Sequence, residues 1–244
     1  MELKAAYKLI LLTYSWKGKH PDVYEVCSSM NRKNNNQNPW LFIPASDYEA
    51  HMGSNGVGQL SVLNSIFKDV LQDIQPRCMA VLGCGTGNGF EHINPQITQK
   101  VLGIDINPKY LKILHKRHGD RFPGLELACS DLYIITYPDH SFNLIHAALV
   151  FEYVDIEKML NKVSRWLTKG GVLSVVLQLP NPKLEMISKT RYTSLKSLES
   201  IMHLVDPIAF NEAAERYGLY KSKETEIPLK SGKKFLLSYY RSSS

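Results

Sequence analysis

The chain has 244 residues, of which 44% are hydrophobic and 21% are charged. These proportions are ordinary for a globular protein, so they exclude wholesale disorder and a fibrous repeat, and the length suits one large domain with or without an appendage. No apolar run approaches the roughly 20 residues that span a bilayer, so we expect no membrane partner. The four cysteines contain no C-x-x-C pair, so no zinc site is predicted. A cytoplasmic location is the simplest expectation.

The net charge of +6 is concentrated at the two ends of the chain. Residues 1–40 hold six basic and three acidic side chains, and residues 221–244 hold six and two. A nucleic-acid-binding domain more often carries a basic stripe across one face. We therefore favour solvated termini, and a surface that binds a polyanion remains the alternative.

The first forty residues differ in character from the rest. Asn31–Asn38 is polar and of low complexity, which is typical of a linker. We expect an N-terminal extension over 1–40, partly linker-like, and the main domain over 41–244. The apolar run Pro39–Pro44 is expected to dock onto that domain.

Helical and strand patterns alternate from residue 61 onward. Apolar residues at helical spacing predict a helix over 61–74. Two further helices are predicted over 108–118 and 155–167, and five apolar strands over 78–82, 100–106, 125–129, 142–149 and 172–179. Continuous apolar strands separated by helices indicate a parallel sheet that is covered on both faces.

The last third of the chain changes pattern. Two helices are predicted over 194–204 and 207–217. Two strands are predicted over 223–228 and 234–240, and the five residues between them suit an antiparallel hairpin.

The clearest motif follows the first predicted strand and has the sequence Gly83-Cys84-Gly85-Thr86-Gly87. Glycines at such a turn let the backbone approach a ligand closely, and the N–H groups of the short helix expected next can meet a polar or anionic group. Asp105 ends the second predicted strand, where a carboxylate can accept hydrogen bonds from both hydroxyls of a ribose. Taken singly, a plain turn and a carboxylate at a helix N-terminus would explain these features. Together they favour a ligand site.

The glycine spacing departs from the dinucleotide pattern G-x-G-x-x-G, because Asn88 stands at the sixth position counted from Gly83. With its G-x-G-x-G pattern the chain resembles the class I S-adenosylmethionine-dependent methyltransferases. The resemblance continues at Ser130-Asp131-Leu132 and in the segments 142–147 and 167–173. It implies an α/β fold: a Rossmann-like, doubly wound, mostly parallel seven-stranded sheet with an antiparallel C-terminal hairpin. It also implies S-adenosylmethionine as the cofactor.

The resemblance implies a cofactor site built from the glycine loop, the ends of the second to fourth strands and an N-terminal segment that closes over them. The implied residues are Tyr48, Met52, Gly83, Cys84, Gly85, Gly87, Asp105, Ile106, Asp131, Leu132, Ala147 and Leu149. Asp105 would bind the ribose and Asp131 the adenine amino group. Val81 stands where the family usually has an acidic residue. The cofactor's amino group would then be oriented differently, or the cofactor bound more weakly.

The implied chemistry is methyl transfer, which needs chiefly in-line alignment of nucleophile, methyl and sulfur. A base is needed only where the nucleophile must lose a proton. The candidate bases are His146 and His51, with Glu152 as a weaker acid–base candidate, and Tyr48 or Tyr153 could position the acceptor. We favour a structural role for each of them.

Several motifs that are typical of nucleic-acid methylation are missing from the sequence. The chain has neither the Asn/Asp-Pro-Pro-aromatic motif of adenine methylation nor a Pro-Cys pair for cytosine methylation, and it lacks aromatics interleaved with arginines along a strand. We therefore expect a small-molecule acceptor, a monomer or homodimer, and helices on the substrate side over 183–220. Methylation of RNA or protein, and a noncatalytic module that binds S-adenosylmethionine, are the alternatives.

Overall fold

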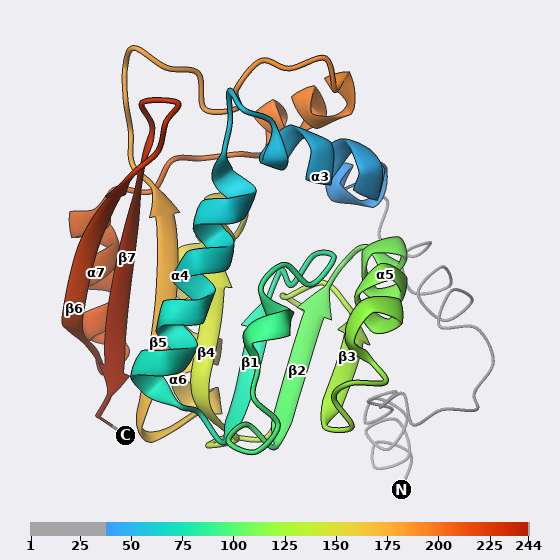
Figure 1. Ribbon diagram of the computed structural model, residues 1–244. Helices are drawn as coiled ribbons and strands as arrows, with labels where there is room; N and C mark the ends of the chain where they lie inside the picture. Colours follow the sequence, from blue (N-terminus) through green and yellow to red (C-terminus); the bar gives the residue numbers. More distant parts are fainter. Residues whose placement is uncertain (1–37, 244) are drawn as a thin grey trace, which may run out of the picture.

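The computed structural model describes residues 38–243 (Figure 1). The predicted extension over 1–40 therefore lies almost wholly outside the described residues. The strands are β1 (Cys78–Leu82), β2 (Lys100–Asp105), β3 (Leu125–Cys129), β4 (Phe142–Ala148), β5 (Leu167–Gln178), β6 (Leu219–Pro228) and β7 (Lys234–Ser242). The α-helices are α3 (Ala45–Gly53), α4 (Gln59–Ile74), α5 (Pro108–His118), α6 (Ile156–Trp166) and α7 (Pro207–Arg216). Short 3-10 helices are η1 (Pro39–Leu41), η2 (Phe90–His92), η3 (Phe151–Tyr153) and η4 (Thr193–Ser200).

The seven strands form one sheet in the order β3-β2-β1-β4-β5-β7-β6. The pairs among β1 to β5 are parallel, whereas β7 runs antiparallel to both β5 and β6. The predicted fold is therefore confirmed: a mostly parallel seven-stranded sheet that closes with an antiparallel C-terminal hairpin.

Helices cover both faces of the sheet, with α4 and α5 on one side and α6 and α7 on the other (Figure 1). Because side chains alternate along a strand, β1 supplies both cores. Met79 and Val81 pack in the core that contains α4, while Ala80 and Leu82 pack in the core that contains α6. This double burial explains why the strands are apolar without interruption.

The helix starts follow local capping chemistry. The side chain of Asn107 accepts a hydrogen bond from the backbone of Lys109 at the start of α5, and the side chain of Asp155 does the same for Lys158 at the start of α6. Such caps satisfy backbone donors that have no partner inside the helix. They place the helix boundaries where the sequence predicts them.

The short helix expected after the glycine loop is the 3-10 helix η2, whose three residues lie between Gly89, which has a positive φ, and Ile93. A Cβ at position 89 would stand 2.7 Å from the Phe67 side chain, so the loop packs directly against α4. The helix predicted over 194–204 is instead the shorter 3-10 helix η4.

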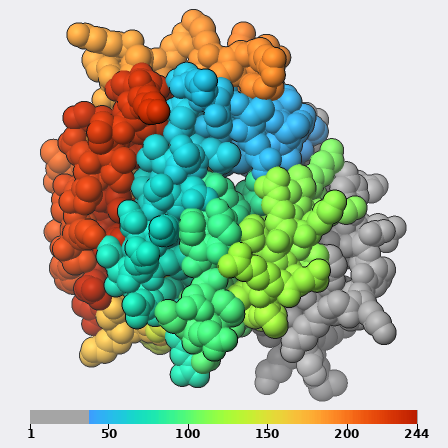
Figure 2. Space-filling model, viewed as in Figure 1, coloured from blue at the N-terminus to red at the C-terminus, as the bar shows by residue number. Residues whose placement is uncertain are grey.

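Two segments form a lid over the carboxyl ends of the parallel strands: residues 38–53, which contain η1 and α3, and residues 186–202, which contain η4. They lie together at the top of the molecule in Figures 1 and 2. Ile43 of the first segment packs against Leu195 and Leu198 of the second, and all three side chains are buried. Within residues 38–243 no helix combines the length and hydropathy needed to cross a bilayer.

Candidate active site

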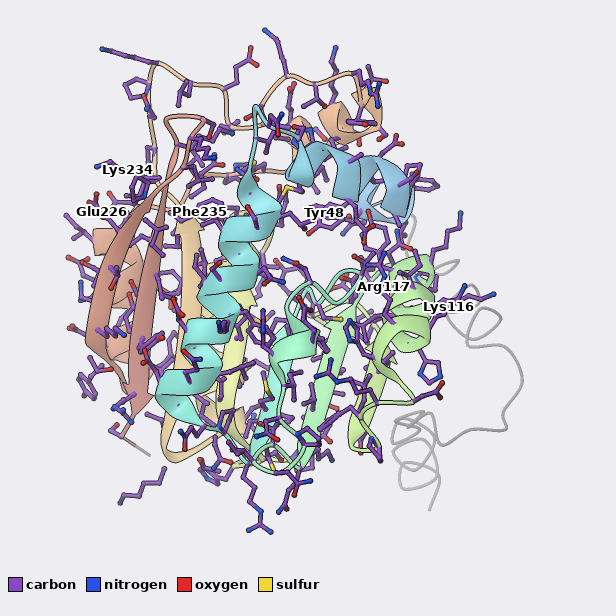
Figure 3. The ribbon with its side chains drawn as sticks, viewed as in Figure 1. Tyr48, Lys116, Arg117, Glu226, Lys234 and Phe235 are labelled. Carbon is purple, nitrogen blue, oxygen red and sulfur yellow. The ribbon has the colours of Figure 1, made fainter. Side chains whose placement is uncertain are left out.

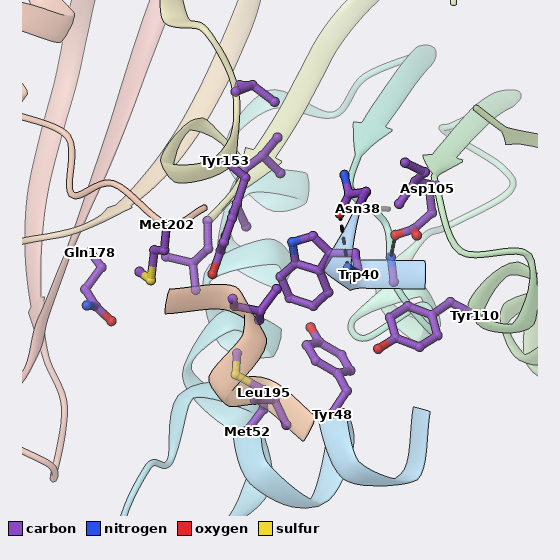
Figure 4. Close-up of a pocket in the computed structure, with 18 of the residues that line it drawn as sticks. Asn38, Trp40, Tyr48, Met52, Asp105, Tyr110, Tyr153, Gln178, Leu195 and Met202 are labelled. Atoms are coloured by element: carbon purple, nitrogen blue, oxygen red, sulfur yellow. Dashed lines mark hydrogen bonds between the residues drawn. The ribbon is translucent and has the colours of Figure 1, made fainter. Parts of the chain in front are cut away.

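A cavity of about 190 Å³ lies between the lid and the carboxyl ends of the strands (Figure 4). Its wall includes the loops that follow β1 and β4, which are neighbours in the sheet. The chain order reverses between these two strands, since β2 and β3 lie on one side of them and β5 to β7 on the other. Ligands of open α/β sheets bind at such a switch point.

The glycine loop forms one wall of this cavity. Gly83, Gly85 and Gly87 all have positive φ, at 60°, 54° and 86°. A Cβ at Gly83 would lie 2.8 Å from the Val150 side chain, and one at Gly87 would lie 2.8 Å from Leu114. Only glycine suits such a backbone conformation where neighbouring atoms also approach this closely. The loop therefore presents main chain, not side chains, to the cavity.

Asp105 faces the loop from the end of β2. Its Oδ2 accepts a hydrogen bond from the Gly85 N–H, and its Oδ1 accepts one from the Asn107 N–H, both at 2.8 Å. Burial raises the pKa of this carboxyl to about 6, against the lowering effect of the backbone donors. Each carboxylate oxygen has two lone pairs, so the group retains acceptor capacity for the hydroxyls of a ligand.

A contact between three elements holds the lid to the loop. Glu49 on α3 accepts a hydrogen bond from Thr86 of the glycine loop and pairs with Arg117 on α5, whose Nη2 lies 3.1 Å from Oε2. Figure 3 shows Arg117 on α5, below the lid residue Tyr48. The hydrogen bond from Arg117 is the main reason why the pKa of Glu49 is lowered.

Aromatic side chains form a further part of the cavity wall, and the Tyr48 ring lies close to Gly85 of the loop. The Trp40 ring lies between Tyr48 and Tyr153, with ring centroids 6.0 and 5.3 Å apart (Figure 4). Tyr48 in turn stacks on Tyr110 at 5.5 Å. Burial raises the pKa of both Tyr48 and Tyr153, so these phenols keep their protons near neutral pH. Sequence reasoning missed Trp40 and Tyr110 as site residues, because neither belongs to a motif.

Nine of the twelve predicted cofactor residues line the cavity: Tyr48, Met52, Gly83, Gly85, Asp105, Ile106, Asp131, Leu132 and Leu149. The other three do not. Cys84 packs in the core that contains α4, Ala147 packs in the opposite core, and Gly87 faces α5. Ala148 lines the cavity in place of its neighbour. Leu149 has a φ of 54°, a conformation that bulky residues rarely adopt.

The candidate catalytic residues also differ in whether they line the cavity. His51 and Tyr153 line the cavity, whereas His146 does not. His146 is buried, its Nδ1 lies 3.1 Å from the Ser174 Oγ, and its ring packs on Phe67. Burial lowers the pKa of His146 to about 4. This histidine therefore acts as a neutral core residue.

Glu152 on η3 is fully buried beside the end of β5. Its Oε1 accepts a hydrogen bond from the Gln178 N–H at 2.8 Å, and its Oε2 has no partner among residues 38–243. Burial raises the pKa of this carboxyl to about 7. The carboxyl therefore titrates near neutral pH, although the side chain does not line the cavity.

The sheet order, the glycine loop and the carboxylate at the end of β2 are those of the class I S-adenosylmethionine-dependent methyltransferase fold. The family described as "Methyltransferase domain" matches residues 80–175. The matched segment contains the glycine loop, Asp105 and Asp131.

Two curated relatives are similar to this chain over part of their own length. The phthiotriol/phenolphthiotriol dimycocerosates methyltransferase of Mycobacterium leprae is 29% identical over 105 residues, which are 42% of this chain and 38% of the relative. The demethylmenaquinone methyltransferase of Deinococcus radiodurans is 28% identical over 109 residues, which are 44% and 45%. The chain thus matches less than half the length of each.

Solved structures share the fold over most of the chain. The N-methyltransferase NodS from Bradyrhizobium japonicum, in complex with S-adenosyl-l-homocysteine, has a TM-score of 0.59 and 16% identity, covering 89% of this chain and 98% of its own. The phosphoethanolamine N-methyltransferase 2 of Haemonchus contortus has a TM-score of 0.61 and 14% identity, covering 82% and 57%. At such identities the likeness concerns the fold.

Proposed function

We propose that this protein is an S-adenosylmethionine-dependent methyltransferase that acts on a small molecule. The observation that carries the proposal is the pairing of the glycine loop with Asp105. The Gly85 N–H donates there to the half-buried Asp105 carboxylate at 2.8 Å, at the switch point of the sheet. Neutral main chain suits a polar amino-acid moiety, and the carboxylate suits a ribose diol.

The residues present fit this cofactor. Gly83 and Gly85 would hold its methionine part, Asp105 the ribose and Asp131 the adenine edge, with Leu132 against the ring. When bound, the cofactor supplies an activated methyl group on a sulfonium. The protein's own contribution would be to align the acceptor with that methyl and to exclude water beneath the lid.

A small acceptor is supported by the lid. Residues from both lid segments line the cavity, so an acceptor must fit under them. The basic C-terminal region offers little to a polyanion, because Lys221, Lys223 and Lys234 each pair with an acidic side chain. RNA and protein are therefore the less favoured acceptors.

The noncatalytic alternative is favoured by Val81. This side chain is buried in the core that contains α4, so position 81 supplies no carboxylate to the glycine loop. The fold alone does not decide, since the [4+2]-cyclase SpnF shares it with a TM-score of 0.58 at 12% identity. Binding and turnover must therefore be measured separately.

Calorimetry with S-adenosylhomocysteine tests the binding half of the proposal, and we expect micromolar affinity. Transfer of a radiolabelled methyl group from S-adenosylmethionine into a cell extract, fractionated into small molecules, RNA and protein, tests the rest. Label in the small-molecule fraction supports the proposal. Binding without label in any fraction would establish a noncatalytic module, and label in RNA or protein would correct the acceptor class.

A further inference from the structure

A buried lysine stands in the cavity wall far from Asp105. Lys233, in the turn between β6 and β7, is only 4% exposed. Its Nζ donates a hydrogen bond to the Met186 carbonyl oxygen at 2.7 Å. Within residues 38–243 no carboxylate lies at ion-pair distance from this ammonium, and nearby Glu185 is paired with Lys189 instead. Among the described residues the Met186 oxygen is its only acceptor, which leaves two of its three N–H groups without one.

Further donors surround this ammonium. The Gln178 Nε2 donates to the same Met186 oxygen at 2.9 Å, and the Gln59 Nε2 donates to the Gln178 Oε1 at 3.3 Å. Each amide nitrogen has a second N–H to offer. His51 is close enough that Lys233 helps to lower its pKa, after the larger effect of burial. We call Gln59, Gln178 and Lys233 the donor cluster.

No acidic side chain balances the donor cluster within the cavity. The two acidic residues of the described cavity wall, Asp105 and Asp131, follow β2 and β3, on the other side of β1. Figure 4 shows Gln178 and Asp105 on opposite sides of the cavity. A buried ammonium without a counter-ion is costly, and burial accordingly lowers the pKa of Lys233 to about 8. The Lys233 ammonium therefore suits an anionic group that a bound ligand supplies.

We propose that the methyl acceptor carries an anionic group, a carboxylate or a phosphate, that binds to Lys233 within the donor cluster. This inference rests on the proposed function, because it assigns the acceptor to that same cavity. The start of β7 is two strand spacings from β4, or roughly 10 Å. The anionic group thus binds at one end of the acceptor, and the atom that receives the methyl lies toward the glycine loop.

The test is calorimetry on protein saturated with S-adenosylhomocysteine. The probes are inorganic phosphate, benzoate and the neutral benzamide, and the variants are Lys233→Met and Lys234→Met. The control is matched because Lys234 is the next residue but is exposed and paired with Glu226 at the edge of the sheet (Figure 3). We expect at least one anion to bind the wild type and Lys234→Met alike, and to bind Lys233→Met roughly tenfold or more weakly. Benzamide should not distinguish the three proteins.

The outcomes separate this inference from the function on which it rests. Removal of an unpaired buried charge should not unfold the protein, and Lys233→Gln provides a second neutral variant. If neither anion binds the wild type, or if both neutral variants bind the anions as the wild type does, the anionic-acceptor inference is overturned. If S-adenosylhomocysteine itself fails to bind the wild type, the proposed function is overturned instead.

Discussion

The two ends of the cavity are built in different ways. At the end that we propose for the cofactor, the glycine loop and Asp105 come from adjacent strands, and the Gly85 N–H makes the contact. At the end that we propose for the acceptor, Gln59, Gln178 and Lys233 come from a helix, a strand and a hairpin turn that are far apart in the sequence. Local sequence therefore specifies the first end, whereas only the complete fold assembles the second.

The largest expected effect concerns Glu152, beside the acceptor end. Its pKa of about 7 in the folded protein lies above the ordinary glutamate pKa of 4.5, because the side chain is buried. The carboxyl thus contributes stability that is complete below pH 4.5 and is lost as the pH rises through 7. At roughly 1.4 kcal/mol per pKa unit, the loss is about 3 kcal/mol. Glu152→Gln should remove this pH dependence from urea unfolding measured between pH 4 and 8. Exposed Glu212→Gln should keep it, and parallel curves for wild type and Glu152→Gln would contradict the assignment.

Asp105→Ala should weaken S-adenosylhomocysteine binding by about 1–3 kcal/mol, because ligand hydroxyls would lose a charged acceptor. Calorimetry measures this loss directly. Asp139→Ala, which removes a surface acid paired with Arg165, is the control and should leave the affinity unchanged. Equal affinity in both variants would remove the ribose role from Asp105.

Gly83→Ala should lower the free energy of unfolding by about 1–2 kcal/mol for the left-handed backbone, and by a further amount for the approach to Val150. Gly170→Ala separates the two contributions, since Gly170 has a φ of 70° but open space around its Cβ position. Urea unfolding should show the larger loss for Gly83→Ala. Equal losses would mean that the close approach costs nothing.

The smallest effect is expected at the lid. Glu49→Gln weakens a half-exposed pair with Arg117, and such pairs contribute about 0–1 kcal/mol to stability. The global stability should therefore hardly change, while S-adenosylhomocysteine should dissociate faster because α3 is held less firmly to the glycine loop. Stopped-flow displacement measures this rate. A rate equal to that of the wild type would show that Glu49 does not hold the lid closed over the ligand.

Much of the sheet could be predicted from the sequence, because the five parallel strands contain apolar runs between clear breaks. The glycine loop and Asp105 could be placed at one edge of the sheet, because they follow or end neighbouring parallel strands. The sequence predicts a short helix after the loop but not that it is the three-residue 3-10 helix η2.

The acceptor end could not be predicted, for physical reasons. Lysine is rarely buried without a partner. The sequence therefore gives no reason to expect that Lys233 is buried while the adjacent Lys234 is exposed. His146 was ambiguous because both faces of β4 are buried, and alternation then no longer tells which face meets the cavity. Trp40 adjoins a polar segment, and its place between two tyrosines depends on how the lid closes.

The hairpin that brings Lys233 to the cavity also ends the sheet. In the part of the chain that the structure describes, β6 has a neighbouring strand on one side only, so its outer backbone groups could pair with a strand of another molecule. Its exposed stretch carries Lys221, Lys223, Glu224 and Glu226. A second strand that approached this edge would have to desolvate those charges, which protects the protein against edge-to-edge aggregation.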